Sequence, residues 1–211
     1  MLEAKKTQYD KSGPRVAQAL ERRHFTAYYC STVSQAAQKI LELIDPTASV
    51  GFGGSVTLDE LNIRNALQER GQKLIDRRDA PREAWGDVMR RALTADVFLM
   101  GSNAVTEDGQ LFNIDGNGNR VAALCYGPKE VIVAVGMNKV VPDAAAAYAR
   151  VRHIAAPMNA QRFGGRTPCT ATGQCGDCVS DDCICASMVL TRFCKPAGKI
   201  KVVLIGEDLG F

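Results

Sequence analysis

The chain has 211 residues, of which 46% are hydrophobic and 23% are charged, and its formal net charge is +3 at pH 7. This length allows one well-buried core, and the composition excludes fibrous, disordered and membrane proteins. Because no run of lysine and arginine exceeds a pair, the sequence does not predict a surface that binds nucleic acid.

The N-terminal third begins with helical patterns. A helix is predicted after Gly13-Pro14, and a clearer amphipathic helix over Ser31 to Ile44 is ended by Pro46. We therefore expect residues 1–45 to form N-terminal helices. The first residues lack the apolar core of a signal peptide, and no apolar run is long enough to cross a membrane, so a cytoplasmic protein is expected.

After Pro46 short apolar runs alternate with helical stretches, which is typical of an α/β protein with a mainly parallel sheet. Residues 46–211 are expected to form this α/β part, so that the chain is effectively one structural domain. The predicted strands are Ser49–Gly53, Lys73–Asp76, Val97–Met100, Gln110–Ile114, Val131–Val135 and Lys201–Ile205. The predicted helices contain Leu58 to Leu67, Trp85 to Leu93 and Asp143 to Val151.

A glycine-rich turn, GFGGSVT from Gly51, follows the first of these strands. Glycines let the backbone approach a ligand, and the free N–H groups of the next helix attract anions. The predicted ligand-binding residues here are Gly51, Gly53, Gly54, Ser55 and Thr57. The backbone N–H groups, and no arginine, are expected to hold a carboxylate. Alternatively the segment is only a tight turn with Thr57 as the helix cap. Neither a dinucleotide fingerprint nor a phosphate-binding loop is present.

A second polar segment, Gly101 to Arg120, begins where another predicted strand ends, and such strand ends are where open α/β sheets bind ligands. Glu107 is the candidate nucleophile or general base. Asn103, Asn113 and Asp115 are the further candidate ligand-binding residues. A calcium loop is excluded because its glycine and its bidentate glutamate are missing, whereas a plain hairpin turn through Asn117-Gly118 remains an alternative.

Six of the eight cysteines lie between Thr167 and Cys194, mostly in a predicted long loop that covers residues 163–194. Disulfides are rare in a reducing cytoplasm, so such a cluster favours a metal or redox site. The predicted ligands are Cys169, Cys175, Cys178 and Cys185. The spacing does not distinguish an iron–sulfur cluster from zinc, and disulfides or unligated thiols remain open. The isolated Cys30 and Cys125 are expected to be buried apolar residues.

Several of these motifs together resemble the LUD-domain family of lactate utilization proteins, formerly DUF162. They are GFGGSVT, the stretch GSNAVTEDGQLFNIDGNGNR, the cysteine run and the C-terminal VVLIGEDLGF. The resemblance implies a three-layer fold similar to that of CoA transferases, ribose-phosphate isomerase and formyltetrahydrofolate cyclo-ligase. It also implies a role in oxidising lactate to pyruvate beside iron–sulfur partner proteins.

Within this resemblance, the stretch Thr106 to Gly109 is similar to the one in which CoA transferases keep their catalytic glutamate, which implies that role for Glu107. Two functions follow. One is support of the oxidation of lactate or a related organic acid, with a small anionic, acyl or phosphate ligand at the glycine turn and an iron–sulfur cluster on the cysteines. The other is a transferase or isomerase that uses Glu107, with a structural zinc or disulfide tail. A non-catalytic subunit of a redox complex and a homo-oligomer are also compatible with the sequence. No nicotinamide or flavin motif is present.

Overall fold

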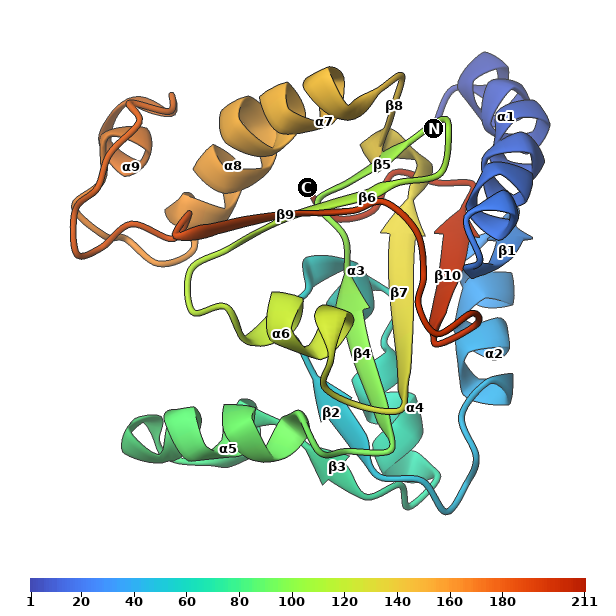
Figure 1. The fold of residues 1–211 in the computed structure, drawn as a ribbon, viewed down its shortest axis with the longest axis horizontal. Coiled ribbons are helices and arrows are strands. Elements are labelled where there is room, and N and C mark those ends of the chain that lie inside the picture. The colour runs from blue at the N-terminus through green and yellow to red at the C-terminus, as the bar shows by residue number, and fades with distance from the viewer.

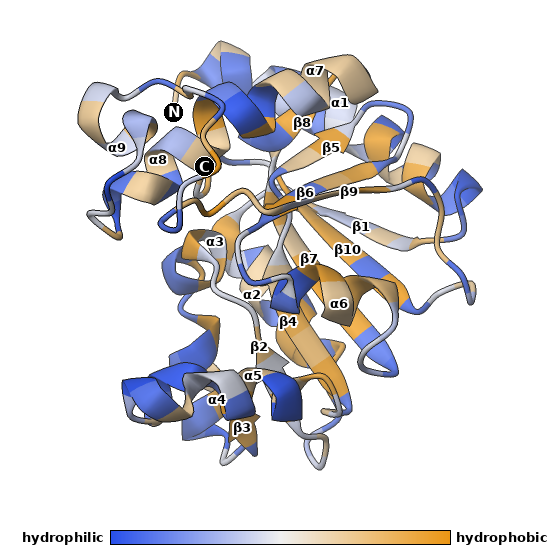
Figure 2. Cartoon of the chain, turned by 60° about the vertical axis from the view of Figure 1, so that its left-hand side comes forward, coloured by the Kyte–Doolittle hydropathy of each residue, from blue (hydrophilic) through white to orange (hydrophobic).

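The computed structural model describes residues 1–211, and its main sheet has six parallel strands in the order β1-β10-β7-β4-β2-β3 (Figure 1). The strands are β1 (Thr26–Cys30), β2 (Val50–Phe52), β3 (Leu74–Ile75), β4 (Val97–Gly101), β7 (Glu130–Gly136) and β10 (Ile200–Ile205). Strands that helices cover on both faces need apolar side chains on both faces. The central strands β4 and β7 accordingly read as continuous hydrophobic runs, which Figure 2 shows in orange.

Helices cover both faces of this sheet. One face packs against α2 (Val33–Glu42), α3 (Val56–Glu60) and α4 (Ile63–Glu69). The opposite face packs against α1 (Glu3–Arg22), α5 (Trp85–Ala92) and α6 (Asn119–Cys125). The hydrophobic core around the main sheet therefore consists of two clusters, one on each side of it. This arrangement confirms the predicted three-layer α/β fold class.

A smaller second sheet lies above the carboxyl ends of the main strands (Figure 1). Its strands, in spatial order, are β8 (Val140–Val141), β5 (Ala104–Thr106), β6 (Leu111–Asp115) and β9 (Ser187–Thr191). It packs against α7 (Ala144–Arg150), a π-helical turn (Val151–Ala155) and α8 (Ala156–Gln161), which together form one continuous helical segment. Pro157 follows the π-helical turn, and the absence of its N–H is a local reason for the irregularity.

The sequence predictions and the structure differ at several elements. The first helix begins at Glu3, before the predicted start, and continues through Pro14. Its N-terminal part is held by a residue near the other end of the chain, because Lys5 and Tyr9 both form hydrogen bonds to Asp208. Residues 1–45 also contain β1, which pairs with β10, and so are not helices alone. The predicted loop 163–194 contains a short helix, α9 (Pro168–Thr172), and strand β9. The predicted hairpin at Asn117-Gly118 is wrong, because this segment leads from β6 into α6.

No helix of the chain combines the length and the apolar composition that a membrane-spanning segment requires.

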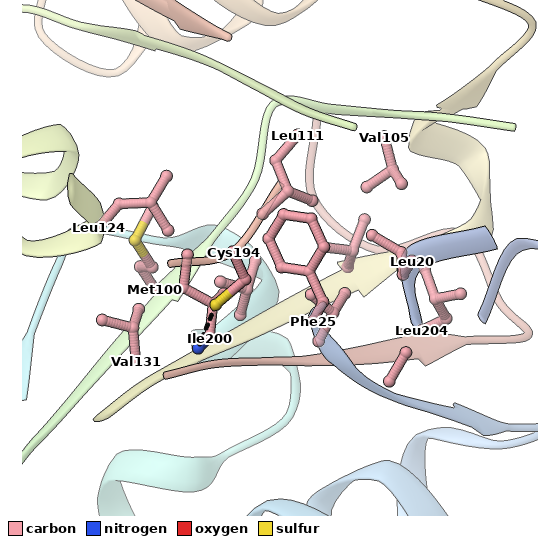
Figure 3. Close-up of a cluster of buried hydrophobic side chains, with 14 of the residues drawn as sticks. Leu20, Phe25, Met100, Val105, Leu111, Leu124, Val131, Cys194, Ile200 and Leu204 are labelled. Carbon is pink, nitrogen blue, oxygen red and sulfur yellow. Dashed lines mark hydrogen bonds between the residues drawn. The ribbon is translucent and has the colours of Figure 1, made fainter. Parts of the chain in front are cut away.

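Cys194 is buried in the hydrophobic core, unlike most of the other C-terminal cysteines. Figure 3 shows it among Leu124, Met100 and Val131, with its sulfur accepting a hydrogen bond of 3.3 Å from the Ile200 backbone N–H. Its Sγ also donates to the Pro196 carbonyl. Cys30 is buried as predicted, whereas Cys125 is exposed, so the prediction for Cys125 is wrong.

The tight turn between β5 and β6 determines how α1 packs on the second sheet. At Gly109 the backbone has φ +90°, and a Cβ there would lie 2.5 Å from the carbonyl carbon of Ala19 in α1. Arg23 at the end of α1 also bonds to the carboxylate and the carbonyl of Asp108. Only glycine therefore satisfies both the left-handed conformation and the close approach of the helix backbone.

We expect Gly109→Ala to lower the free energy of unfolding by about 3 kcal/mol, which combines backbone strain with the steric conflict against α1. Gly71→Ala is the matched control, because Gly71 has φ +74° and an added Cβ would meet no atom within 4 Å. That control is expected to cost about 1 kcal/mol. Urea unfolding of both variants measures the difference, and equal losses would contradict the packing argument.

Candidate functional site

The predicted glycine turn, Gly53 to Ser55, connects β2 to α3 at the carboxyl end of the sheet. Ser55, and not Thr57, caps this helix, because its Oγ accepts the Leu58 N–H at 3.3 Å. Gly51 lies inside β2, where a Cβ would be 2.8 Å from the Ala92 carbonyl oxygen, so its glycine serves the packing of α5. Two of the predicted turn residues, Gly54 and Ser55, line a pocket.

This inner pocket has a volume of about 60 Å³ and lies where β2 and β4 end, as expected for a ligand site in a parallel sheet. Asn103 from the second polar segment lines it as predicted. Five further polar side chains line it that the sequence did not predict: Ser102, Arg120, Lys139, Asn159 and Arg162. Gly54, Ser55, Val56, Gly101 and Phe211 complete the wall.

Arg120 is fixed in place at the base of the pocket. Its guanidinium donates to the carbonyl of Gly101 at 3.2 Å, to that of Ile114 at 2.7 Å and to Oδ1 of Asn103 at 3.1 Å. Asp115 completes the set with an ion pair at 3.3 Å. Burial lowers the pKa of Arg120, and the charge of Asp115 opposes this effect. Arg120 is thus a preorganised donor with its conformation already determined.

The structure gives Asn113 and Asp115 different roles from those predicted. Asp115 accepts the backbone N–H groups of Asn117 and Gly118, so it holds the turn into α6 as well as Arg120. Asn113 is fully buried, and its Nδ2 has no hydrogen-bond partner. Neither residue lines the inner pocket, although Asp115 lines the groove outside it.

Lys139 is a buried lysine whose side chain forms no ion pair. It follows β7 and is 3% exposed. Its Nζ donates to Oγ1 of the buried Thr57 at 2.8 Å. The pKa of Lys139 is lowered to about 7, mainly by burial and also by the positive charges of Arg150 and Arg120, while Glu60 opposes the shift. Thr57 lies inside α3, past the cap position that Ser55 holds, and its hydroxyl is the partner of Lys139.

A wider groove of about 470 Å³ opens outside the inner pocket, and the two share Gly54, Arg120, Asn159 and Arg162 in their walls. Three arginines of the groove form no ion pair with any carboxylate: Arg77, Arg82 and Arg162. Arg77 instead lies over the ring of Trp85, with 4.9 Å between the guanidinium carbon and the ring centroid. Unpaired cations around a glycine turn form a favourable environment for an anionic ligand.

The predicted cysteine ligands converge on one cavity of about 160 Å³. Five thiols line it: Cys169, Cys175, Cys178, Cys183 and Cys185. Arg152, from the π-helical turn, donates to the sulfur of Cys175 from Nε at 3.3 Å and from Nη2 at 3.2 Å. The pKa of Cys185 is raised to about 12, mainly by burial and also by the neighbouring Cys183.

In this arrangement of side chains no group of three or more His, Cys, Asp or Glu residues is placed to hold a metal ion. The donor type and the common cavity fit a thiolate-ligated group, but the ligand geometry itself is not formed. The metal site therefore stays a prediction.

The cysteine cavity and the cationic groove share a wall. Cys183 and Ile184 line both spaces. The inner pocket, at the ends of β2 and β4, therefore adjoins the groove, and the groove adjoins the thiol cavity. The helical segment α7–α8 connects them, because it carries Arg152 at the cysteines and Asn159 at the pocket.

Glu107 lies apart from this series. It is exposed in the turn between β5 and β6 and lines a cavity of about 360 Å³ against α1, together with Arg15, Arg22 and Tyr9. This cavity and the inner pocket share no residue. The structure therefore does not bring Glu107 to the glycine turn.

We expect the stability of the protein to depend on pH through Lys139. Because its folded-state pKa is about 7 and the ordinary value is 10.5, the unfolded chain binds more protons between these values. The free energy of unfolding therefore rises as the pH rises through that range, and it falls again as the pH falls toward 7. In Lys139→Met this rise should disappear, whereas Lys129→Met, on the surface, should retain it. Urea unfolding at pH 7 and pH 9 measures the difference, and identical slopes in both variants would contradict it.

Comparison with known proteins identifies the family. A DUF162 family protein from Deinococcus radiodurans has a similar structure, with a TM-score of 0.55 and 11% sequence identity over 93% of this chain and 98% of that chain. Two further matches are partial. Ribose 5-phosphate isomerase A from Neisseria gonorrhoeae has a TM-score of 0.34 and 17% sequence identity over 52% of each chain. The tetrameric eIF2B-β2-δ2 complex from C. thermophilum has a TM-score of 0.39 and 18% sequence identity over 58% of this chain and 48% of that chain.

No curated protein matches the chain in sequence. The LUD domain family, in contrast, matches residues 14–205, which is nearly the whole chain. This range includes the groove, all eight cysteines and every residue that lines the inner pocket except Phe211. This chain belongs to the LUD domain family.

Proposed function

We propose that this LUD protein binds a small organic anion in the inner pocket and supports the oxidation of lactate or a related organic acid with an iron–sulfur cluster held by its cysteines. Membership of the family supports a role related to lactate utilization in general. The observation that carries the finer proposal is the wall, at Cys183 and Ile184, that the cavity lined by five thiols shares with the groove outside the inner pocket.

The pocket suits a short carboxylate for two physical reasons. Its positive groups, Lys139 and Arg162, have no carboxylate partner within the protein, so an anion would not have to displace one. Its volume of about 60 Å³ would accommodate about four water molecules, which is the size of an acid with three or four carbons. Ser102 and Asn103 add polar side chains for the remaining oxygen atoms of such an acid.

In the cysteine cavity, Cys169, Cys175, Cys178 and Cys185 would hold the cluster. When bound, an iron–sulfur cluster accepts and donates single electrons at a potential set by its charge and its hydrogen bonds. Arg152 would offset the negative charge of the Cys175 thiolate, as its two hydrogen bonds to that sulfur indicate. Cys183 is the fifth thiol, on the side of the groove. A partner iron–sulfur protein would then exchange electrons with this chain.

The exposed position of Glu107, away from the pocket, gives no support to the alternative of a transferase or isomerase that uses this residue. Zinc remains the alternative occupant of the cysteine cavity, since four thiolates also suit a tetrahedral structural site.

We expect Cys175→Ser to abolish binding of iron and acid-labile sulfide, together with the visible absorption of protein purified without oxygen. Cys125→Ser is the control, because Cys125 is exposed and lies outside the cavity. Metal and sulfide analysis measures both variants. Stoichiometric zinc, or iron retained by the Cys175 variant, would contradict the proposed cluster.

We expect lactate, pyruvate and inorganic phosphate to raise the melting temperature of the protein, because a ligand that binds only the folded state stabilises it by mass action. In Arg162→Gln the affinity for these anions should fall about tenfold, because one charge-assisted contact is lost, and the shift in melting temperature should become smaller. Arg90→Gln removes the same charge at an exposed ion pair with Asp87 and should leave the shift unchanged. An equal shift in both variants would show that the anion binds elsewhere.

A further inference from the structure

Among the cations of the inner pocket, Lys139 differs from the arginines in chemistry as well as in position. An arginine stays protonated, whereas a lysine amine that has lost its proton is a nucleophile toward carbonyl carbon. Lys139 is 3% exposed and lines the pocket, and its one hydrogen-bond partner is the hydroxyl of Thr57 at 2.8 Å. A hydroxyl carries no charge, so it stabilises the protonated amine less than a carboxylate would.

The surroundings of Lys139 oppose its positive charge from several elements. Arg150 comes from α7 and Arg120 from α6, and both act on it as like charges, while Glu60 of α3 is the opposing negative group. Lys139 forms no ion pair with Glu60 or with any other carboxylate. With a pKa of about 7, a substantial fraction of this amine is neutral at pH 7, and it lines a pocket whose other charged groups are arginines.

A pocket with this composition recognises two groups on one small molecule: an anion for the guanidinium groups and an electrophilic carbon for the amine. We infer that Lys139 forms an imine with the carbonyl carbon of a short 2-oxo acid whose carboxylate lies against Arg162. This inference rests on the proposed anion pocket and extends it to a covalent step and a specific substrate class.

The step is a condensation without oxidation or reduction. The lone pair of Nζ forms the C–N bond, and the carbonyl oxygen takes up the protons that the nitrogen loses. The carbinolamine then releases that oxygen as water and leaves a C=N bond. One amine and one carbonyl are consumed, and one imine and one water are formed. Neither the iron–sulfur cluster nor another reactant is needed.

The test is reductive trapping of the full-length protein with sodium pyruvate and cyanoborohydride, followed by intact mass and peptide mapping. We expect one reduced pyruvyl adduct per chain, on the peptide that contains Lys139. Lactate, which has the carboxylate but no carbonyl, should raise the melting temperature and leave no adduct. Acetone, which has the carbonyl but no carboxylate, should leave no adduct either.

Lys139→Met should abolish the adduct, and Lys199→Met is the matched control. Lys199 is also buried, with a pKa lowered by burial, but it lies at the Leu124 carbonyl, away from the pocket. The adduct should therefore persist at full yield in the Lys199 variant. Peptide mapping of the unaltered protein gives the same answer without relying on the folding of either variant.

Three results would overturn the inference. If pyruvate raises the melting temperature but no adduct forms, the anion pocket is correct and the covalent step is wrong. If an adduct forms on another lysine and survives in Lys139→Met, Lys139 is not the nucleophile. If pyruvate, lactate and phosphate all fail to change the melting temperature, the anion pocket itself is wrong, and the inference fails with it.

Discussion

The guanidinium of Arg120 bonds to both sheets at once. It donates to the Gly101 carbonyl, where β4 of the main sheet ends, and to the Ile114 carbonyl in β6 of the second sheet. Asp115 orients it and also holds the turn from which Arg120 itself arises. A buried charge with several fixed partners has little freedom to reorient. The distance between the two sheets, and hence the inner pocket between them, depends on this group.

The helical segment from α7 to α8 provides the second constraint. Arg150 donates to the carbonyl of Asn103 at 2.5 Å, so the segment is attached to the strand end beside the pocket. Two residues later Arg152 reaches the sulfur of Cys175, and α8 continues to Asn159 in the pocket wall. The π-helical turn shifts the helix face between these contacts. One rigid element thus determines the relative position of the thiols and the anion pocket.

Several residues of the site carried recognisable signals in the sequence. Gly54, Ser55 and Asn103 stand directly after predicted strands, and parallel strands end at one edge of a sheet, so their proximity could be predicted. Lys139 follows a predicted strand in the same way but was not recognised, because a single lysine carries no spacing pattern. No local pattern distinguishes Arg120 and Arg162 from ordinary surface charges. The burial of Arg120 and the lack of a carboxylate partner for Arg162 depend on elements distant in the chain.

By itself the sequence determined the alternation of apolar strands and amphipathic helices, and with it an α/β fold with a mainly parallel sheet, because side-chain periodicity is a local property. It also determined that thiols are concentrated near the C-terminus. Only the tertiary structure decided the short strands of the second sheet, which are stabilised by pairing with distant partners rather than by their own composition. It likewise separated Glu107 from the glycine turn, placed Cys194 in the core and brought Lys139 to the pocket. Burial and neighbouring charge, which determine the chemistry of such groups, exist only after the chain has folded.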